Sequence, residues 1–310
     1  METLLVTHSA CLAHEVPAGH PECPDRLRAV LAALDAEEFA LLIRATAPLA
    51  SVEQIARVHD AALIDYLMQA SPSAGFHRID ADTAMSHGTM EAALRAAGAV
   101  VHAVDEVMAG KARNAFCAIR PPGHHAEPGQ AMGFCFFNNV AIGALHARAV
   151  HGVSRPAVID FDVHHGNGTQ SAFEGDASLF YASTHQSPLY PGTGAAHETG
   201  IAKNIVNACL VPGAGSEQFR EVFTGIIMPA LSQFDPDFIF ISAGFDAHMA
   251  DPLANLRLTE DDYGWATSEL VRYAEKHCEG RVVSTLEGGY DLGALNASTK
   301  AHVRALQCTL

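Results

Sequence analysis

Short apolar runs alternate with longer amphipathic segments along most of the chain. The short runs are mostly apolar throughout and rich in β-branched residues, as expected of strands that are buried on both faces of a sheet. They predict strands at Leu4–Thr7, Ala115–Ile119, Ala157–Phe161, Leu179–Ser183, Asn204–Leu210, Phe238–Ser242 and Val282–Leu286.

The amphipathic segments predict helices that cover such a sheet. At the start of one of them, Thr259 precedes three consecutive carboxylates, which is typical of a helix N-cap followed by acids at the positive end of the helix dipole. The predicted helices are Asp25–Leu34, Met90–Met108, Asn139–Val150, Glu217–Leu231, Glu260–Lys276 and Leu295–Leu306.

Alternation of strands and helices indicates a parallel sheet with helices on both faces. No repeat, low-complexity tract or linker divides the chain. We therefore predict an α/β fold in which residues 1–310 form a single domain, built on an open parallel sheet of seven to eight strands.

Composition excludes several classes of protein. Hydrophobic residues make up 49% of the chain and charged residues 17%, which is too apolar and too weakly charged for a disordered protein. No run approaches the ~18 apolar residues of a membrane span. The first eight residues lack the basic flank and apolar stretch of a signal peptide. These features predict a soluble, cytoplasmic protein that does not interact with membranes.

The net charge and the cysteines indicate which partners the protein binds and in which redox compartment it resides. The net charge of −16 disfavours nucleic acid and favours cationic ligands such as lysine side chains and polyamines. The seven cysteines include no CxxC pair, which indicates free thiols in a reducing compartment, most of them packed as small core residues. The oligomeric state stays open, with a homodimer and a homotetramer among the options.

Polar motifs follow four of the predicted strands. The chain holds eighteen histidines, among them two adjacent pairs, and histidine suits both metal ligation and proton transfer. Parallel sheets bind ligands at the carboxyl ends of their strands, which is where these motifs lie. The motifs are Arg120–His125, Asp160–Gly168, Ala243–Asp246 and Glu287–Tyr290.

The second and third motifs predict a metal site. Asp162 and His164 are two positions apart, so on an extended segment their side chains point the same way, and Asp160 lies on that side one step deeper. Asp246, from another strand end, completes three ligands with an open position, the form of a catalytic zinc site that would also accept Fe(II) or Mn(II). The alternative is that the two aspartates of the first segment cap the following helix and His164 is a core histidine.

His124 and His125 follow a rigid Pro-Pro-Gly turn and are candidates for acid–base chemistry beside the metal. An imidazole becomes a better base when its second nitrogen donates to a carboxylate or amide, and Asp160 and Asn167 are candidate acceptors. Tyr290 follows two glycines and could donate to a developing oxyanion. The alternatives are a surface histidine pair and a tyrosine that only anchors its loop.

Taken together, the motifs RPPGHH, GFCFFNN, DFDVHHGNGTQ, SAGFDAH and EGGY resemble the histone deacetylase family, within the wider arginase/deacetylase fold. The likeness extends from His20 to Tyr290 and covers nearly the whole chain. Asn167 occupies the position where class I enzymes carry Asp, so the motif of this chain is similar to that of class II enzymes and their bacterial relatives. The resemblance implies no firm role for His20 or Arg26.

The resemblance implies a role for each matched residue. Zn(II) would be bound by Asp162, His164 and Asp246. The catalytic group would be His125 as general base and acid, His124 with Asp160 as its electrostatic partner, Asn167 beside it, and Tyr290 as the oxyanion donor. The acyl-lysine channel would include Gly133, Phe134, Tyr190 and Leu253. Structural potassium would lie near Asp160, Asp162, His164 and Ser183, with a second site near Phe173.

The resemblance thus predicts a zinc-dependent hydrolase that cleaves the amide of acyl-lysine. The first alternative is an amidohydrolase of acetylated polyamines or other small amides. Polyamine-selective relatives carry an acidic residue near the channel mouth where this chain has Leu253, which favours acyl-lysine. A catalytically silent acyl-binding protein is a remote alternative, because it would predict damage to the metal or acid–base set, and all of these residues are present.

Overall fold

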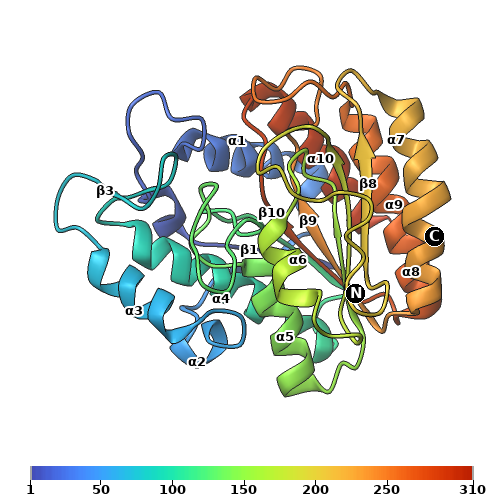
Figure 1. Ribbon diagram of the computed structural model, residues 1–310, viewed down its shortest axis with the longest axis horizontal. Helices are drawn as coiled ribbons and strands as arrows, with labels where there is room; N and C mark the ends of the chain where they lie inside the picture. Colours follow the sequence, from blue (N-terminus) through green and yellow to red (C-terminus); the bar gives the residue numbers. More distant parts are fainter. Residues whose placement is uncertain (1, 309–310) are drawn as a thin grey trace.

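Eight parallel strands form one sheet within residues 2–308, the part of the chain that the computed structural model describes (Figure 1). Their order across the sheet is β2-β1-β5-β10-β9-β6-β7-β8. The strands are β1 (Thr3–Thr7), β2 (Ile43–Thr46), β5 (Asn114–Cys117), β6 (Pro156–Asp160), β7 (Phe180–Gln186), β8 (Ile205–Leu210), β9 (Phe238–Ala243) and β10 (Val282–Leu286). A separate antiparallel pair joins β3 (His77–Arg78) to β4 (Ala84–Met85).

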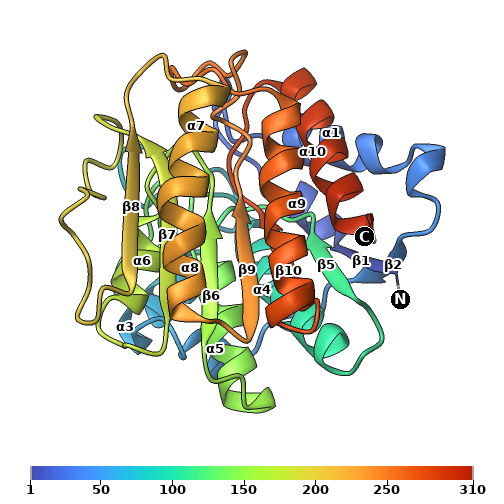
Figure 2. The ribbon, with the colours of Figure 1, turned by 90° about the vertical axis from the view of Figure 1, so that its right-hand side faces the viewer.

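Helices cover both faces of the sheet, as Figure 2 shows. The helices α1, α9, α10 and the α7–α8 segment lie on one face, and α4 and α5 lie on the other. The helices are α1 (Pro24–Leu34), α2 (Val52–Ile55), α3 (Ala61–Ala70), α4 (Thr89–Met108), α5 (Asn139–His151), α6 (Asn167–Phe173), α7 (Ser216–Val222), α8 (Met228–Phe234), α9 (Glu260–His277) and α10 (Leu292–Gln307). The central strands are therefore buried on both sides, as their apolar sequences predict.

The four strands that precede the polar motifs are neighbours in the sheet. β5, β10, β9 and β6 lie side by side, although β6 precedes β9 and β10 in the chain. Their register sets Asp160, the last residue of β6, opposite Ser242 of β9 and Ser183 of β7. The loops that leave these strand ends must therefore meet at the carboxyl ends of the parallel strands.

The sequence predictions of the α/β fold and of all seven strands are confirmed, with ends that differ by a few residues. Three kinds of element are missing from the prediction, the first of which is the short antiparallel pair β3–β4. The edge strand β2 is largely exposed and lacks a buried apolar run, and the short helices α2, α3 and α6 lack a long amphipathic pattern. The helix predicted at Glu217–Leu231 is one continuous segment that passes from α7 through a π-helical turn at Phe223–Ile227 into α8.

Two further predictions about local structure hold. Thr259 is the N-cap residue of α9 as predicted, and the Asp262 carboxylate accepts a hydrogen bond from its backbone N–H at 3.0 Å. All seven cysteines lie within residues 2–308 and have free thiols. Four of them are buried, namely Cys11, Cys117, Cys135 and Cys278.

A buried ion network joins the start of α1 to two of the strand-end loops. Glu22, Arg26 and Arg120 are each fully buried. Arg120 donates to both carboxylate oxygens of Glu22, and Arg26 Nη1 donates to Glu22 Oε1 at 2.9 Å. Arg26 also donates to the backbone carbonyls of Glu287 and Gly289. Because each guanidinium is paired and hydrogen-bonded, the network can hold the loops after β5 and β10 in place.

We predict that Glu22→Gln destabilises the protein by about 3–5 kcal/mol, because it leaves two buried guanidinium groups short of a counter-charge. The matched control is Asp25→Asn, whose exposed pair with Arg28 on the same helix should contribute about 0–1 kcal/mol. Urea unfolding followed by circular dichroism measures both. A loss below 1 kcal/mol for Glu22→Gln would contradict the role of the network.

The same network predicts a dependence of stability on pH. Burial disfavours ionisation of Glu22, but the charge of Arg120 and the hydrogen bonds from His14 and Arg120 outweigh it and hold its pKa well below the ordinary value of 4.5. A carboxyl whose pKa is lower in the folded state stabilises the fold above its unfolded pKa. The contribution is therefore full at neutral pH and is lost as the pH falls below about 4.5.

Candidate active site

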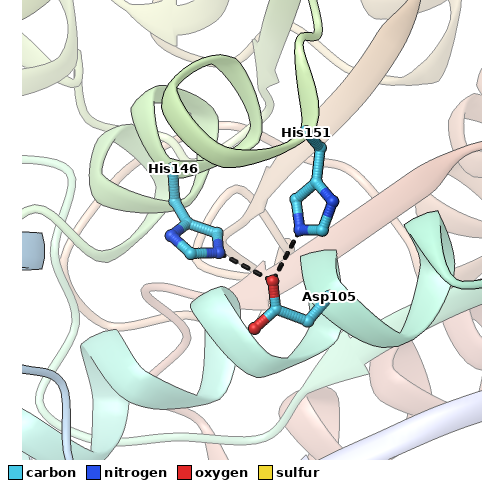
Figure 3. A group of neighbouring side chains, drawn as sticks. All are labelled: Asp105, His146 and His151. Atoms are coloured by element: carbon cyan, nitrogen blue, oxygen red, sulfur yellow. Dashed lines mark hydrogen bonds and ion pairs between the residues drawn. The ribbon is translucent and has the colours of Figure 1, made fainter.

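Two groups of side chains within residues 2–308 bring three metal-ligating atoms within 4.8 Å of one another. One group lies between α4 and α5 and comprises Asp105, His146 and His151 (Figure 3). The other comprises Asp162, His164 and Asp246, and it lies in the loops that follow β6 and β9. The second group is buried and contains the three ligands that the sequence predicts.

The backbone around this second group is not extended, which corrects the reasoning from side-chain alternation. β6 ends at Asp160, and residues 162–164 form bends. The Asp160 Oδ1 accepts from the backbone N–H of Asp162 at 3.0 Å, and Asp162 Oδ1 accepts from the N–H of His164 at 2.9 Å. Aspartates favour such local turns because their short side chains bond their own backbone two residues on. The turns, rather than strand alternation, bring the side chains together.

The three predicted ligands approach one another closely. His164 Nδ1 lies 3.1 Å from Asp162 Oδ1 and 3.0 Å from Asp246 Oδ2. Asp246 Oδ1 also accepts from the backbone N–H of Val163 at 2.8 Å, which fixes the orientation of that carboxylate. One imidazole nitrogen and two carboxylates thus point to a common position at the edge of the sheet.

The electrostatics of this group favour a cation. Burial and the neighbouring Asp162 carboxylate raise the pKa of Asp246 to about 7. Burial also disfavours a charged His164, but its contacts with Asp162 and Asp246 outweigh that effect and raise its pKa to about 10. Within residues 2–308, the salt-bridge partners of the two carboxylates are histidines. Two buried carboxylates with an imidazole between them fit a divalent ion such as zinc, because its charge offsets theirs.

Glycine at position 288 is required by the close approach of the backbone to the carboxylates. The N–H of Gly288 donates to Asp162 Oδ2 at 2.8 Å. A Cβ at this position would lie 2.6 Å from Asp162 Oδ2 and would clash with Asp246 Oδ2. The Glu-Gly-Gly-Tyr motif therefore shapes the metal group as well as carrying Tyr290.

The two histidines of the Pro-Pro-Gly turn lie beside this group, with ring centroids 4.1 Å apart and ring planes tilted by 45°. His124 Nδ1 lies 3.0 Å from Asp160 Oδ2, and His125 Nδ1 lies 2.8 Å from Asn167 Oδ1, the two acceptors expected from the sequence. Burial disfavours a charged His124, but the Asp162 and Asp160 carboxylates outweigh it and raise its pKa to about 10. Burial and the positive charges of His124 and His164 lower the pKa of His125 well below 6.5.

The hydrogen bonds around Asn167 assign the tautomer of His125. Asn167 Nδ2 donates to Glu127 Oε1 at 2.7 Å, so the amide oxygen faces His125. Because an amide oxygen only accepts, His125 Nδ1 carries a proton and Nε2 is its basic nitrogen. Glu127 is therefore a positioning residue that sequence reasoning does not single out.

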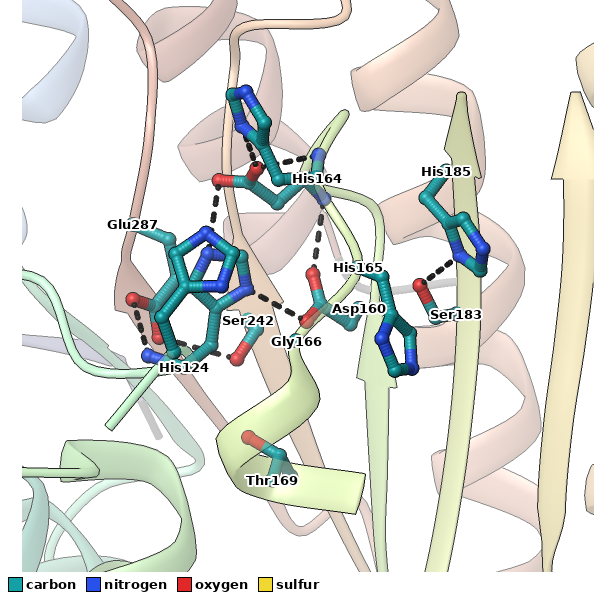
Figure 4. A network of polar contacts seen from close by, with 12 residues as sticks. His124, Asp160, His164, His165, Gly166, Thr169, Ser183, His185, Ser242 and Glu287 are labelled. Carbon is teal, nitrogen blue, oxygen red and sulfur yellow. Dashed lines mark hydrogen bonds and ion pairs between the residues drawn. The ribbon is translucent and has the colours of Figure 1, made fainter. Parts of the chain in front are cut away.

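Glu287 positions the turn that carries the two histidines, as Figure 4 shows. Its carboxylate accepts from the backbone N–H groups of Gly123 and His124, at 2.7 and 3.2 Å, and from the Ser242 hydroxyl at 3.1 Å. It is fully buried, and burial raises its pKa to about 7. The sequence offers a signal in the acidic residue at the end of a buried strand, but its partners become apparent only from the order of the strands.

Tyr290 is held by contacts with its backbone and ring. Its N–H donates to Asp251 Oδ2 at 2.7 Å, and the guanidinium of Arg26 lies 4.8 Å from the ring centroid. Burial raises the pKa of the Tyr290 phenol well above 10, so the hydroxyl keeps its proton. Arg26, to which the sequence assigns no role, therefore both supports the Tyr290 loop and contacts its ring.

A cavity of about 240 Å³ leads to the site. It is lined by the four residues expected in the channel, Gly133, Phe134, Tyr190 and Leu253, and by His125, His164, Tyr290, Asp82 and Leu189. The Phe134 ring meets Tyr290 edge-on at 6.0 Å, and the Tyr190 ring meets His125 edge-on at 5.2 Å. Aromatic and aliphatic walls around a polar end would suit an alkyl chain that carries an amide.

The residues expected around monovalent cations lie on neighbouring elements. Ser183 of β7 is opposite Asp160 in the sheet, and its hydroxyl contacts His185 Nδ1 at 2.9 Å. Phe173 ends α6, away from this pair, and its carbonyl accepts from Asn204 Nδ2 at 3.0 Å. The cation roles of these residues remain predictions.

Comparison with known proteins places the chain in a family. Residues 20–306 match the model of the histone deacetylase domain. The chain is 42% identical to histone deacetylase 14, chloroplastic, of Arabidopsis thaliana, over 98% of this chain and 76% of that protein. It is 40% identical to the histone deacetylase-like amidohydrolase of Pseudomonas aeruginosa, over 88% of this chain and 73% of that protein. The chain belongs to the histone deacetylase family.

A solved structure shows the same fold. The crystal structure of the HDA15 HD domain superposes with a TM-score of 0.93 at 35% sequence identity, covering 99% of this chain and 88% of that one. The protein therefore has the arginase/deacetylase fold, and its family comprises deacetylases and amidohydrolases. Among the described residues, none of the helices is both long enough and apolar enough to cross a membrane.

We predict that Gly288→Ala removes most of the bound divalent metal, because the added methyl group displaces both carboxylate ligands. Elemental analysis of the purified protein measures the metal content. The matched control is Gly175→Ala, where an added Cβ meets no atom within 4 Å. A Gly288→Ala protein that keeps the metal content of the wild type would show that the carboxylates are not confined as described.

Proposed function

We propose that this protein is a zinc-dependent deacylase that hydrolyses the amide of acyl-lysine, with residues 1–310 as one catalytic domain. The observation that carries the proposal is that candidate metal ligands and candidate acid–base groups lie at the same cavity. His164 of the metal group lines that cavity together with His125 and Tyr290, and Asp162 and Asp246 lie directly behind His164. Phe134, Leu189 and Leu253 give the cavity apolar walls that would suit the alkyl chain of an acyl-lysine, and Asp82 adds one carboxylate to its lining.

Asp162, His164 and Asp246 would hold the zinc ion. When bound, zinc supplies Lewis-acid chemistry, because it acidifies water and polarises an acyl carbonyl. Fe(II) would suit the same oxygen-rich donor set. Gly288 holds the Asp162 carboxylate through its N–H, and the Val163 N–H holds Asp246, so both ligands are oriented before a metal binds.

His125 is the group that moves the proton. Its Nε2 takes a proton from the attacking water, while Asn167 holds the proton on Nδ1. The protonated imidazole then donates from Nε2 to the leaving amine. The neighbouring charge of His124 favours this second transfer, because two adjacent imidazolium rings repel each other. General acid–base catalysis of this kind contributes roughly 10²–10⁴-fold.

His124 acts through charge rather than through proton transfer. Its hydrogen bond to Asp160 and its raised pKa keep it protonated at neutral pH. Asp160 is itself held by the Tyr181 hydroxyl at 3.0 Å and by the N–H of Asp162. His124, held by Asp160, therefore places a fixed positive charge beside His125 and keeps His125 in its basic form.

Tyr290 donates its hydroxyl hydrogen to the oxygen of the tetrahedral intermediate. The phenol keeps its proton at all working pH values, and its loop is fixed from Arg26 and Asp251. A fixed donor costs no reorganisation as the charge develops. Gly133 and Phe134 border the same cavity, where the Gly133 carbonyl would receive the substrate amide N–H.

Potassium and location complete the proposal. Backbone carbonyls near Asp160, Asp162, His164 and Ser183 would hold one potassium ion, and the end of α6 at Phe173 a second. The free thiols support a cytoplasmic location. The partner is an acylated lysine or related acylated amine.

The proposal predicts that the wild type cleaves an acetyl-lysine peptide and that Tyr290→Phe loses about 10²–10³-fold in turnover, because one oxyanion donor is removed. Zinc content should stay unchanged, since Tyr290 is not a ligand. A fluorogenic acetyl-lysine peptide and elemental analysis measure the two properties. The control is Tyr66→Phe, which alters a partly exposed phenol on α3. Turnover near that of the wild type in Tyr290→Phe would reject the oxyanion role.

Acetylated polyamines are the alternative substrate, and the net charge of −16 favours them. Leu253 lines the cavity and offers no charge to a second ammonium group. We therefore predict that kcat/KM for an acetyl-lysine peptide exceeds that for acetylputrescine. Leu253→Glu should shift the ratio toward acetylputrescine by roughly tenfold, the effect of one charge-assisted contact. A wild type that prefers acetylputrescine would overturn the choice of substrate.

A further inference from the structure

Asp105, His146 and His151 form a second potential metal group that the proposed chemistry does not use (Figure 3). Asp105 lies in the last turn of α4, and His151 is the last residue of α5, five positions before β6 begins. Asp160 and the candidate active site lie at the other end of β6. The group therefore lies at the amino-terminal ends of the strands, opposite the end that carries the candidate catalytic residues.

The two imidazoles point at one carboxylate oxygen. His146 Nε2 lies 2.7 Å from Asp105 Oδ1, and His151 Nε2 lies 2.6 Å from the same atom. The rings are 5.6 Å apart between centroids and inclined at 70°, so each nitrogen faces the oxygen from its own direction. Ligands around a tetrahedral zinc are separated by about 3.3 Å, given Zn–N distances near 2.0–2.1 Å. Each of the two nitrogen–oxygen contacts would have to open by about 0.6–0.7 Å to admit an ion.

The group is reachable from solvent but anchored in the protein. The side chain of His146 is 5% exposed, that of His151 22% and that of Asp105 43%. A metal held here would have three protein ligands fixed on two packed helices, and water could complete its coordination. Two imidazoles and a carboxylate suit zinc and neighbouring first-row divalent ions.

Arg57 determines the tautomer of the His146 imidazole in the absence of a metal. Its Nη1 lies 2.7 Å from His146 Nδ1. Because a guanidinium only donates, Nδ1 must be the acceptor, and the ring proton resides on Nε2, where it bonds Asp105. A metal at Nε2 requires the opposite tautomer, with the proton on Nδ1. The Arg57 side chain must then turn away, toward the exposed Glu53 carboxylate that already lies 3.3 Å from its Nη2.

We propose that Asp105, His146 and His151 bind a second divalent ion of the zinc class, which joins the end of α4 to the end of α5. The ion forms bonds to Asp105 Oδ1 and to Nε2 of each histidine. At His146 the proton lost from Nε2 is taken up at Nδ1 through exchange with water, and the hydrogen bond from Arg57 breaks. At His151 the proton moves in the same way to Nδ1. Because the ion binds the folded state, it stabilises the helix pair beside β6.

Zinc binding to the holoenzyme tests the proposal. Equilibrium dialysis against buffered free zinc, followed by elemental analysis, should give one equivalent fewer for His151→Ala than for the wild type. His277→Ala is the matched control, because His277 is also the last residue of a helix, α9, and this variant should bind as much zinc as the wild type. Asp246→Ala should keep the second equivalent, which separates this site from the catalytic one.

Thermal unfolding gives an independent readout. Added zinc should raise the Tm of the wild type and of His277→Ala after the catalytic site is saturated, and should leave that of His151→Ala unchanged. Circular dichroism checks that His151→Ala is folded. Equal zinc content and equal Tm shifts in the wild type and His151→Ala would overturn the proposal.

Arg57→Ala distinguishes a metal site from a hydrogen-bonded clamp. Without the Arg57 donor, His146 can carry its proton on Nδ1 at no cost, so zinc should bind about tenfold more tightly, which corresponds to the loss of one hydrogen bond from a charged donor. Isothermal titration calorimetry with zinc on the holoenzyme measures the change. Binding that is unchanged or weaker in Arg57→Ala would contradict the replacement of the Nε2 proton by the ion.

Discussion

Asp162 and Asp246 place two carboxylates side by side in a region from which water is excluded. Like charges in such surroundings are costly, and the structure offsets them with His164 between them and His124 beside them. Two backbone features serve this pair directly. Gly288 gives the backbone room to approach it, and Val163 supplies an N–H to it. A bound divalent ion would supply the positive charge that the protons on the histidines supply in its absence.

The order of the strands makes this arrangement achievable. β5, β10, β9 and β6 are neighbours, so the loops that carry His124, Glu287, Asp246 and Asp162 leave the same edge of the sheet. The buried network of Glu22, Arg26 and Arg120 connects the loops after β5 and β10 to the start of α1. The site is thus held by hydrogen bonds to backbone groups as much as by packing, which suits groups that must keep their geometry through a reaction.

Much of this could be predicted from the sequence because the signals are local. Apolar runs predict the buried strands, and the motifs that follow them identify Asp162, His164, Asp246 and Tyr290. The edge strand β2 was missed because an exposed strand carries no apolar run. The bends at residues 162–164 were missed because aspartate side chains, rather than the strand period, set the backbone there. Partners distant in sequence, such as Glu287 with Gly123, depend on strand order and have no local signal.

The central claim is that Asp162, His164 and Asp246 hold one zinc ion at the end of the channel. Anomalous diffraction from crystals of the purified wild type, collected above and below the zinc absorption edge, tests this most directly. We expect a strong peak, present only above the edge, within bonding distance of all three side chains. A map with no such peak among them, in protein that still cleaves acetyl-lysine, would contradict it.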